Sequence, residues 1–210
     1  MRSLHRIPWI DEVVVVDDGS DDDTAGEARR AGARVVRLGR RRGKGSALQA
    51  GIEAAASPHV LLCDADLGPS AVGLFALCEA VGAGEADLAI GRLPGGRGAG
   101  LGLVRRLAAA GVRRLGGQAL AAPLSGQRAT LRSWATALVA GPPCGFGVEV
   151  RMDVRALRWG LRVLEVPVRV THRPTTWSRQ GVLHRARQFL DVARTLNDLR
   201  LEGRDEEART

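Results

Sequence analysis

The sequence predicts a single α/β domain, residues 1–210, with a mostly parallel sheet flanked by helices. Short apolar runs alternate with segments of helical periodicity over the first 90 residues, as in βαβ units. The runs 13–16 and 59–63 are nearly continuous aliphatic stretches, typical of strands that are buried on both faces. We find no internal repeat and no composition shift that would mark a second domain.

The expected elements follow one another with short connections. Thr24 or Asp23 is well placed to cap the first helix, and Ser46 the second. The charged residues 202–210 predict a frayed tail. The pattern predicts strands at 13–16, 33–38, 59–63, 86–90 and 161–170, and helices at 25–31, 46–56, 70–81, 103–120 and 181–201.

The composition narrows the classes of partner. The net charge of +8 comes almost entirely from arginine, because Lys44 is the only lysine, and this pattern indicates codon bias rather than a polyanion partner. Scarce aromatic residues and the lack of any nucleic-acid motif argue against nucleic-acid binding. Phosphate-bearing small molecules or an anionic lipid surface fit the charge. Three cysteines without zinc or redox spacing predict buried thiols in the cytoplasm.

Asp64 and Asp66 follow directly after the aliphatic run 59–63. In extended geometry, a spacing of i, i+2 places both carboxylates on one face of the strand end. Neighbouring carboxylates repel each other unless a cation lies between them, and Mg²⁺ prefers carboxylates together with substrate phosphates. The alternative is an acidic turn after a strand. The pair therefore predicts a metal site that needs support from other segments.

Two loops in the first half have features of a nucleotide site. Asp17, Asp18 and Ser20 follow a buried strand, where ligands bind in open α/β sheets and where a carboxylate can accept hydrogen bonds from a base or ribose. Lys44 lies between Gly43 and Gly45 at a helix start, which suits a diphosphate but lacks the spacing of a Walker A loop. For the acidic loop, an ordinary strand-to-helix turn is the alternative.

Two candidates come from the second half. Glu149 follows a Gly-Phe-Gly turn and could act as a base or position an acceptor, although it could equally begin a helix and favour its dipole. A single histidine is more often structural than a metal ligand, but His172 follows an alternating strand and precedes a proline-containing loop, a context that modestly strengthens the case for metal coordination.

Taken in order, five motifs resemble those of family 2-type glycosyltransferases of the GT-A fold, over about residues 4–195. The motifs are VVVVDDGSDDDT (13–24), GKGSALQAG (43–51), LLCDADLG (61–68), PLSGQRA (123–129) and GFGVE (145–149). The last two resemble those of bacterial enzymes related to glucosyl-3-phosphoglycerate synthases and polyprenyl-phosphate glycosyltransferases.

The resemblance implies a GT-A (Rossmann-like) fold and metal-dependent transfer of a sugar from a nucleotide-diphosphate sugar to a hydroxyl or phosphate acceptor. Mg²⁺ or Mn²⁺ would be bound by Asp66 and His172, with Asp64 contacting the metal through water or the ribose. Glu149 would be the candidate catalytic base. The donor-binding residues implied are Asp17, Asp18, Ser20, Lys44 and Asp64.

The acceptor implied is anionic, such as a phosphorylated small molecule or a polyprenyl phosphate. Arg97, Arg105 and Arg106 could hold it, and a solvated basic helix face is the alternative. Peripheral membrane contact through the segment 103–120, and a homo-oligomer, are left open.

One departure from the family concerns its usual first strand. Family members begin with a strand and a P-x-x-N-E type turn, whereas residues 1–9 match only the end of the helix that follows. That strand would lie between the strands 13–16 and 59–63, and each buried polar group left unpaired there costs about 1–3 kcal/mol. We therefore expect either a start further upstream, or a poorly soluble product with little donor hydrolysis. A non-catalytic, donor- or partner-binding protein is thus an alternative function. A sugar nucleotidyltransferase is disfavoured, because no GxGxR loop is present.

Overall fold

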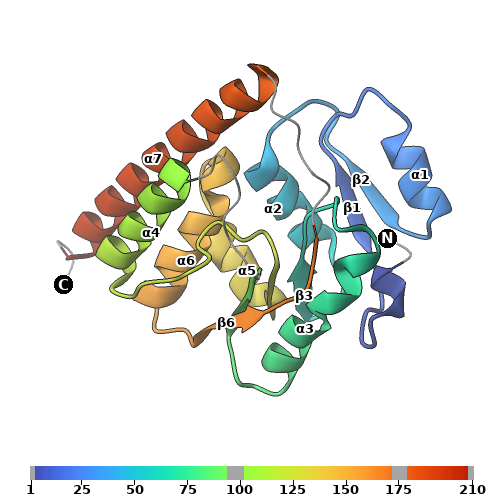
Figure 1. Cartoon of the computed structure of the whole chain (residues 1–210), viewed down its shortest axis with the longest axis horizontal. Coiled ribbons are helices and arrows are strands. Elements are labelled where there is room, and N and C mark those ends of the chain that lie inside the picture. The colour runs from blue at the N-terminus through green and yellow to red at the C-terminus, as the bar shows by residue number, and fades with distance from the viewer. Residues whose placement is uncertain (1–2, 94–101, 172–178, 208–210) are drawn as a thin grey trace.

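The computed structural model describes residues 3–93, 102–171 and 179–207, with side chains described for 185–204 in the last range. Strands and helices alternate through the first half, and helices dominate the second (Figure 1). The strands are β1 (Val14–Asp17), β2 (Arg34–Arg37), β3 (His59–Leu62), β4 (Leu88–Arg92), β5 (Arg128–Leu131) and β6 (Val163–Pro167). The α-helices are α1 (Thr24–Arg30), α2 (Lys44–Ala54), α3 (Phe75–Gly82), α4 (Gly102–Gly116), α5 (Arg132–Val139), α6 (Val148–Arg158) and α7 (Arg179–Glu207). Short 3₁₀ turns are η1 (Leu4–Arg6), η2 (Gly68–Leu74) and η3 (Gly145–Gly147).

The strands form two sheets. β1 and β2 pair in parallel, while the second sheet has the order β3-β5-β4-β6. In that sheet β4 and β6 are parallel, but β5 runs antiparallel to both β3 and β4. The α/β class is confirmed. The antiparallel β5 was not expected, because its residues Arg-Ala-Thr-Leu form no aliphatic run like those of β1 and β3.

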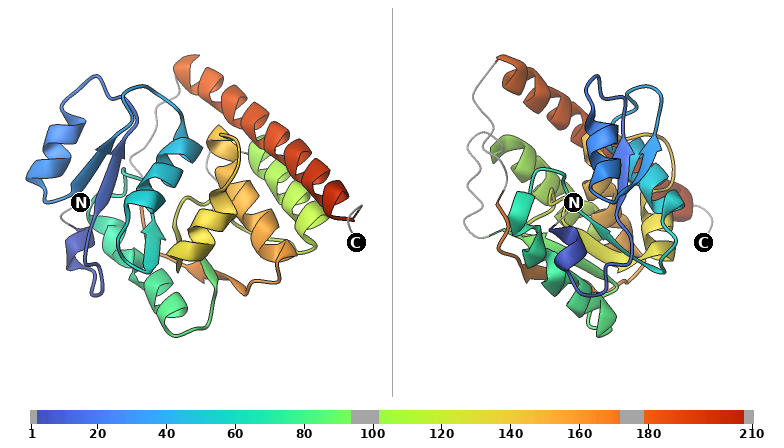
Figure 2. Two further views of the ribbon diagram at one scale, coloured as in Figure 1. Left: turned by 180° about the vertical axis from the view of Figure 1, so that it is seen from behind. Right: turned by 90° about the vertical axis from the view of Figure 1, so that its right-hand side faces the viewer.

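β1 and β3 belong to different sheets. Within the described ranges, β1 pairs only with β2 and β3 only with β5. The family's usual first strand would lie between β1 and β3, and the edges of β1 and β3 that it would pair with have no strand partner among the described residues. β1, β2 and α1 form one side of the molecule, and α4 and α7 form the opposite side (Figure 2).

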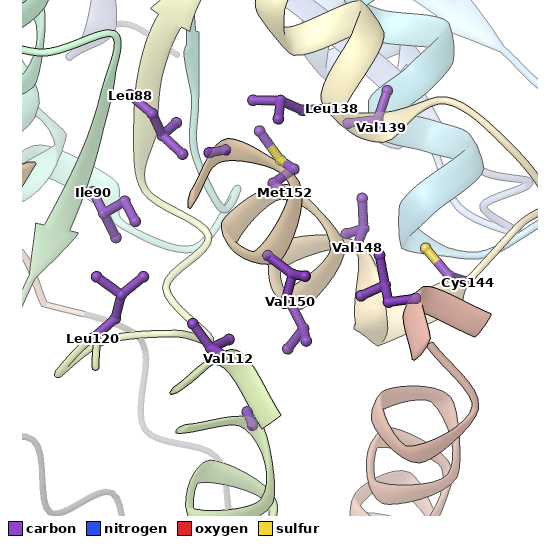
Figure 3. Close-up of a cluster of buried hydrophobic side chains, with 14 of the residues drawn as sticks. Leu88, Ile90, Val112, Leu120, Leu138, Val139, Cys144, Val148, Val150 and Met152 are labelled. Atoms are coloured by element: carbon purple, nitrogen blue, oxygen red, sulfur yellow. The ribbon is translucent and has the colours of Figure 1, made fainter. Parts of the chain in front are cut away.

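The main core lies between the four-stranded sheet and the helices α4, α5 and α6. Leu88 and Ile90 of β4 face Val112 of α4 and Met152 of α6 (Figure 3), and all four side chains are fully buried. Burial of one such side chain stabilises the fold by about 1.5–3 kcal/mol. Since α6 is packed from all sides, the residues of its first turn are held rigidly.

Several element boundaries differ from the predictions. α2 begins at Lys44 rather than Ser46, because Gly43 adopts a φ of 88° and the Ser46 hydroxyl bonds back to the Arg42 carbonyl instead of capping. The predicted helix 70–81 is divided into η2 and α3, and the strand predicted at 161–170 is limited to β6.

The C-terminal helix is longer than predicted. α7 continues to Glu207 instead of ending near residue 201. Arg155 of α6 forms an ion pair with Glu202, at 2.8 Å between Nη2 and Oε1, and this contact holds the helix where fraying was expected. None of the described helices combines the length and the apolar character needed to cross a bilayer.

Candidate active site

Three segments that are distant in sequence meet at one ammonium group. Lys44 Nζ, in the first turn of α2, lies 2.9 Å from Asp64 Oδ1 and 2.7 Å from Glu149 Oε1. Asp64 follows β3, and Glu149 lies in the first turn of α6. The Glu149 side chain is 5% exposed, against 26% for Lys44 and 31% for Asp64. The cation is thus fixed from within the protein and reachable from solvent.

The electrostatics keep Lys44 charged. Burial alone would lower the pKa of Lys44, but the charges of Glu149 and Asp64 outweigh burial and raise that pKa above its ordinary value. An ammonium held in this way can bind a phosphate group as a fixed point charge.

Asp64 has a second partner that the sequence reasoning missed. Its backbone N–H donates to Gln127 Oε1 at 3.1 Å, and Gln127 Nε2 donates to Asp64 Oδ2 at 2.8 Å. Gln127 comes just before β5 and is 1% exposed. The available signal was its place in the motif PLSGQRA, where a buried amide needs a polar partner.

The geometry of the carboxylate pair differs from the prediction. β3 ends at Leu62, and Asp66 lies in a turn, so the extended geometry that would place Asp64 and Asp66 on one strand face does not apply. Asp64 is instead oriented by Gln127. Asp66 follows in the turn and is half-buried.

The acidic loop after β1 is built around two carboxylates with different partners. Asp17 is buried and accepts hydrogen bonds from the Ser20 N–H (2.7 Å) and Arg37 Nε (3.0 Å). The Ser20 bond is the main reason why the pKa of Asp17 lies below its usual value. Asp17 therefore shapes the turn in which Ser20 is presented.

Asp18 connects this loop to the start of α2. Its carboxylate oxygens accept the backbone N–H groups of Arg42 and Gly43, at 2.7 Å and 2.8 Å. Gly19 adopts a φ of 81°, and a Cβ there would lie 3.0 Å from the Arg41 nitrogen. The acidic loop and the Lys44 loop thus form one unit.

The structure does not place every residue that the sequence predicts for the site. His172 and Arg97 lie outside the described residues. Arg105 and Arg106 are exposed on α4. The part of the chain that the structure describes contains no group of three or more His, Cys, Asp or Glu arranged around a metal position.

The residue types at this position nevertheless fit a hard divalent cation. Asp64 offers carboxylate oxygens beside Lys44, and Asp66 follows two residues later in the turn. Mg²⁺ and Mn²⁺ prefer such oxygens and are commonly held by one or two carboxylates plus substrate phosphates, which Lys44 can also bind. A metal therefore fits the site together with its substrate.

The three cysteines are thiols rather than disulfides. All three are free, and Cys144 is buried. Burial raises the pKa of Cys63 to about 11, so that its thiol stays protonated and unreactive. The prediction of buried thiols is confirmed for Cys144, while Cys63 and Cys78 are half-buried.

The chain is similar to proteins that are named as glycosyltransferases. An uncharacterized glycosyltransferase of Mycobacterium bovis is 45% identical over 89 residues, which cover 42% of this chain and 40% of that protein. The dolichyl-phosphate beta-glucosyltransferase of Mus musculus is 39% identical over 72 residues, which cover 31% of this chain and 22% of that enzyme. The match thus spans less than half the length of these relatives.

Solved structures show the same fold over more of the chain. Glucosyl-3-phosphoglycerate synthase from Mycobacterium tuberculosis, in complex with phosphoglyceric acid, matches with a TM-score of 0.72 and 31% identity, over 90% of this chain and 69% of that chain. A complex of the same synthase with Mn²⁺, UDP-glucose and phosphoglyceric acid gives a TM-score of 0.69 and 29% identity, over 90% of this chain and 68% of that chain. The sequence model described as "Glycosyl transferase family 2" matches residues 3–144. Because this match covers more than half of the chain, we conclude that the protein belongs to glycosyl transferase family 2.

Proposed function

We propose that this protein transfers a sugar from a nucleotide-diphosphate sugar to an acceptor hydroxyl or phosphate, with Mg²⁺ or Mn²⁺ as cofactor. The observation that supports this most directly is the cluster of Lys44, Asp64 and Glu149, which combines a fixed cation, a metal-type carboxylate and a nearly buried carboxylate. The solved relatives bind UDP-glucose with Mn²⁺, so that UDP-glucose is the first donor to test.

In this proposal, the donor binds to the start of α2 and to the acidic loop that follows β1. Lys44 and the amides at the start of α2 bind the diphosphate, since helix N-termini favour anions. Asp17, Asp18 and Ser20 form the loop that receives the nucleoside. Asp64, Asp66 and His172 hold the metal, which when bound offsets the charge that develops on the departing nucleoside diphosphate.

Glu149 acts at the acceptor side. In an inverting transfer, the acceptor oxygen bonds to the anomeric carbon, the bond from that carbon to the phosphate oxygen breaks, and Glu149 takes the acceptor proton. In a retaining transfer, Glu149 contacts the sugar instead. The anomeric configuration of the product, read by NMR, distinguishes these two roles.

The acceptor side of the proposal follows the relatives. The solved synthase binds phosphoglyceric acid, and the mouse relative is named for dolichyl phosphate, so that a phosphorylated acceptor is proposed. The three free cysteines support a reducing, cytoplasmic location, with or without membrane contact.

Calorimetry with UDP-glucose and GDP-mannose, with and without Mn²⁺, tests the donor site. We expect one of these donors to bind more tightly with Mn²⁺, and Asp66→Ala to abolish this metal-dependent gain. Tight binding without any donor hydrolysis would favour the non-catalytic alternative. Absence of binding to either donor would contradict both.

A further inference from the structure

The segment before β5 lies directly against Asp64 and is not used in the function proposed above. We infer that Gln127 is a positioning residue that fixes the Asp64 carboxylate in the orientation used at the donor site, and that Gly126 leaves the space this carboxylate occupies. The inference rests on the proposed function.

Gln127 holds Asp64 at two points. Its Oε1 accepts the Asp64 backbone N–H (3.1 Å), and its Nε2 donates to Asp64 Oδ2 (2.8 Å). The other oxygen, Oδ1, lies 2.9 Å from Lys44 Nζ. Because Lys44 and Gln127 donate to different oxygens of Asp64, the carboxylate plane is fixed. Gln127 is 1% exposed, so it has little room to change rotamer.

Gly126 permits this arrangement. A Cβ at position 126 would lie 2.7 Å from both Oδ1 and Oδ2 of Asp64. Gly126 is not among the glycines with positive φ, so that its backbone conformation is open to alanine. An added methyl group would therefore displace the Asp64 carboxylate without straining the loop.

The segment that carries these residues is itself anchored. The Ser125 hydroxyl donates to the Gly91 carbonyl at 2.6 Å, and Arg128 Nε donates to the Ser125 carbonyl at 2.8 Å. Arg128 Nη1 pairs with Asp153 Oδ1 at 2.5 Å, and both side chains are buried. Gln127 is thus held by a rigid part of the core rather than by a surface loop.

The same contacts connect Asp64 to Glu149. Asp153 lies one helical turn after Glu149 on α6, and Glu149 shares Lys44 with Asp64. Gln127 fixes Asp64, and its sequence neighbour Arg128 fixes Asp153 on the helix that carries Glu149. The two carboxylates that pair with Lys44 are thus positioned from one short segment, and Gln127 acts through Asp64.

The effect of Gln127 is tested by measuring UDP affinity with Mn²⁺ and without metal, because a positioning role predicts a loss mainly in the presence of Mn²⁺. Gln127→Leu and Gly126→Ala are compared with the wild type for UDP binding, in Mn²⁺ and in EDTA. We expect both variants to lose about tenfold or more of the affinity in Mn²⁺, and about twofold or less in EDTA. The matched controls are Gly102→Ala, where a Cβ would meet no atom within 4 Å, and Gln118→Leu in an exposed loop. Both controls should behave as the wild type.

Two binding results would overturn the inference. Unchanged affinity in Mn²⁺ for both variants would show that Asp64 needs no positioning. An equal loss in Mn²⁺ and EDTA would show a purely structural role. If the wild type binds no UDP in either condition, the proposed function fails. Crystal structures of the wild type and Gln127→Leu then decide the inference separately, because an unchanged Asp64 rotamer in the variant would contradict it.

Discussion

At the scale of single residues, the central group of the site is the Lys44 ammonium, which lies between the carboxylates of Asp64 and Glu149. Lys44 balances Asp64 and Glu149, so that the nearly buried Glu149 is not left with an unpaired charge, whose cost is high in a low-dielectric interior. The same ammonium is the group that we propose for the donor diphosphate. When a diphosphate binds, its charge competes with the two carboxylates for Lys44.

Lys44→Met removes this charge while retaining most of the aliphatic stem. We expect UDP affinity to fall about 30-fold or more, corresponding to about 2 kcal/mol for truncating one partner of a buried charge pair. Calorimetry measures the affinity. An unchanged dissociation constant would contradict the role of Lys44 at the diphosphate.

The raised pKa of Lys44 also predicts a pH profile. A raised folded-state pKa means that the stabilisation is fully present below the ordinary pKa of 10.5, and is lost only as the pH rises through the higher folded value. Lys44 does not titrate between about pH 6 and about pH 9 in either the folded or the unfolded state. The difference in unfolding free energy between the wild type and Lys44→Met should therefore be constant over this range. Urea unfolding across this range measures it. A difference that disappears towards the alkaline end would contradict the assignment.

Glu149→Gln separates chemistry from binding. The amide cannot take a proton, so an inverting enzyme should lose about 100-fold or more in kcat, with UDP-glucose binding changed only a few-fold. Steady-state kinetics and calorimetry measure the two quantities. Glu53→Gln, on the exposed face of α2, is the matched control. A retained kcat would exclude Glu149 as the base.

The sequence could predict these residues only in part. Lys44, Asp64 and Glu149 were assigned to one site because their motifs follow a family order, not because their spacing dictates contact. Gln127 was missed because its role depends on the tertiary approach of two loops. Asp17 and Asp18 are in the expected loop, but the structure shows them bonded to Ser20, Arg37 and the start of α2.

At the scale of elements, α6 connects the site to the core. It carries Glu149 in its first turn and Asp153 one turn later, and Asp153 forms a buried ion pair with Arg128 of β5. Burial raises the pKa of Asp153 to about 6, and the charge of Arg128 acts in the opposite direction. The pair fixes the register of α6 against β5.

Asp153→Ala should destabilise the protein by about 3–5 kcal/mol, because it leaves the Arg128 guanidinium buried without its partner. The double variant Arg128→Met with Asp153→Leu should be closer to the wild type, since no charge remains buried. Urea unfolding monitored by far-UV circular dichroism measures both. A double variant as unstable as the single one would contradict this account of the pair.

Element types were predictable where an apolar run or a helical period marked them. The strands β1 to β4 and the helices α1, α2 and α4 lie within a few residues of the expected ranges. β5 was missed because its residues form no aliphatic run. The end of α7 was missed because a tertiary ion pair, Arg155 with Glu202, overrides the polar composition of the tail.

At the scale of the whole molecule, the division into two sheets is the dominant feature. The β1–β2 unit is supported by a small cluster of three buried side chains, Val13, Ala28 and Ala33, whereas the four-stranded sheet packs on the main core. The acidic loop of the donor site belongs to the small unit, and Asp64 and Glu149 belong to the large one. Donor binding would therefore hold the two units together.

Native-state hydrogen exchange should detect this difference. Amides of β1 and β2 should exchange faster than those of β4 and β5, because a strand with an unpaired edge and few buried contacts opens at lower free energy. UDP with Mn²⁺ should slow exchange in β1 more than in β4. Equal protection in both sheets without ligand would contradict this division.

The central claim is that Lys44, Asp64 and Asp66 form the diphosphate and metal site of a glycosyltransferase. Crystals soaked with Mn²⁺ and UDP-glucose test it most directly, through the anomalous signal of manganese. The account predicts an anomalous peak within coordination distance of Asp66, with the diphosphate in contact with Lys44 Nζ. A peak elsewhere, or a diphosphate bound away from Lys44, would contradict it.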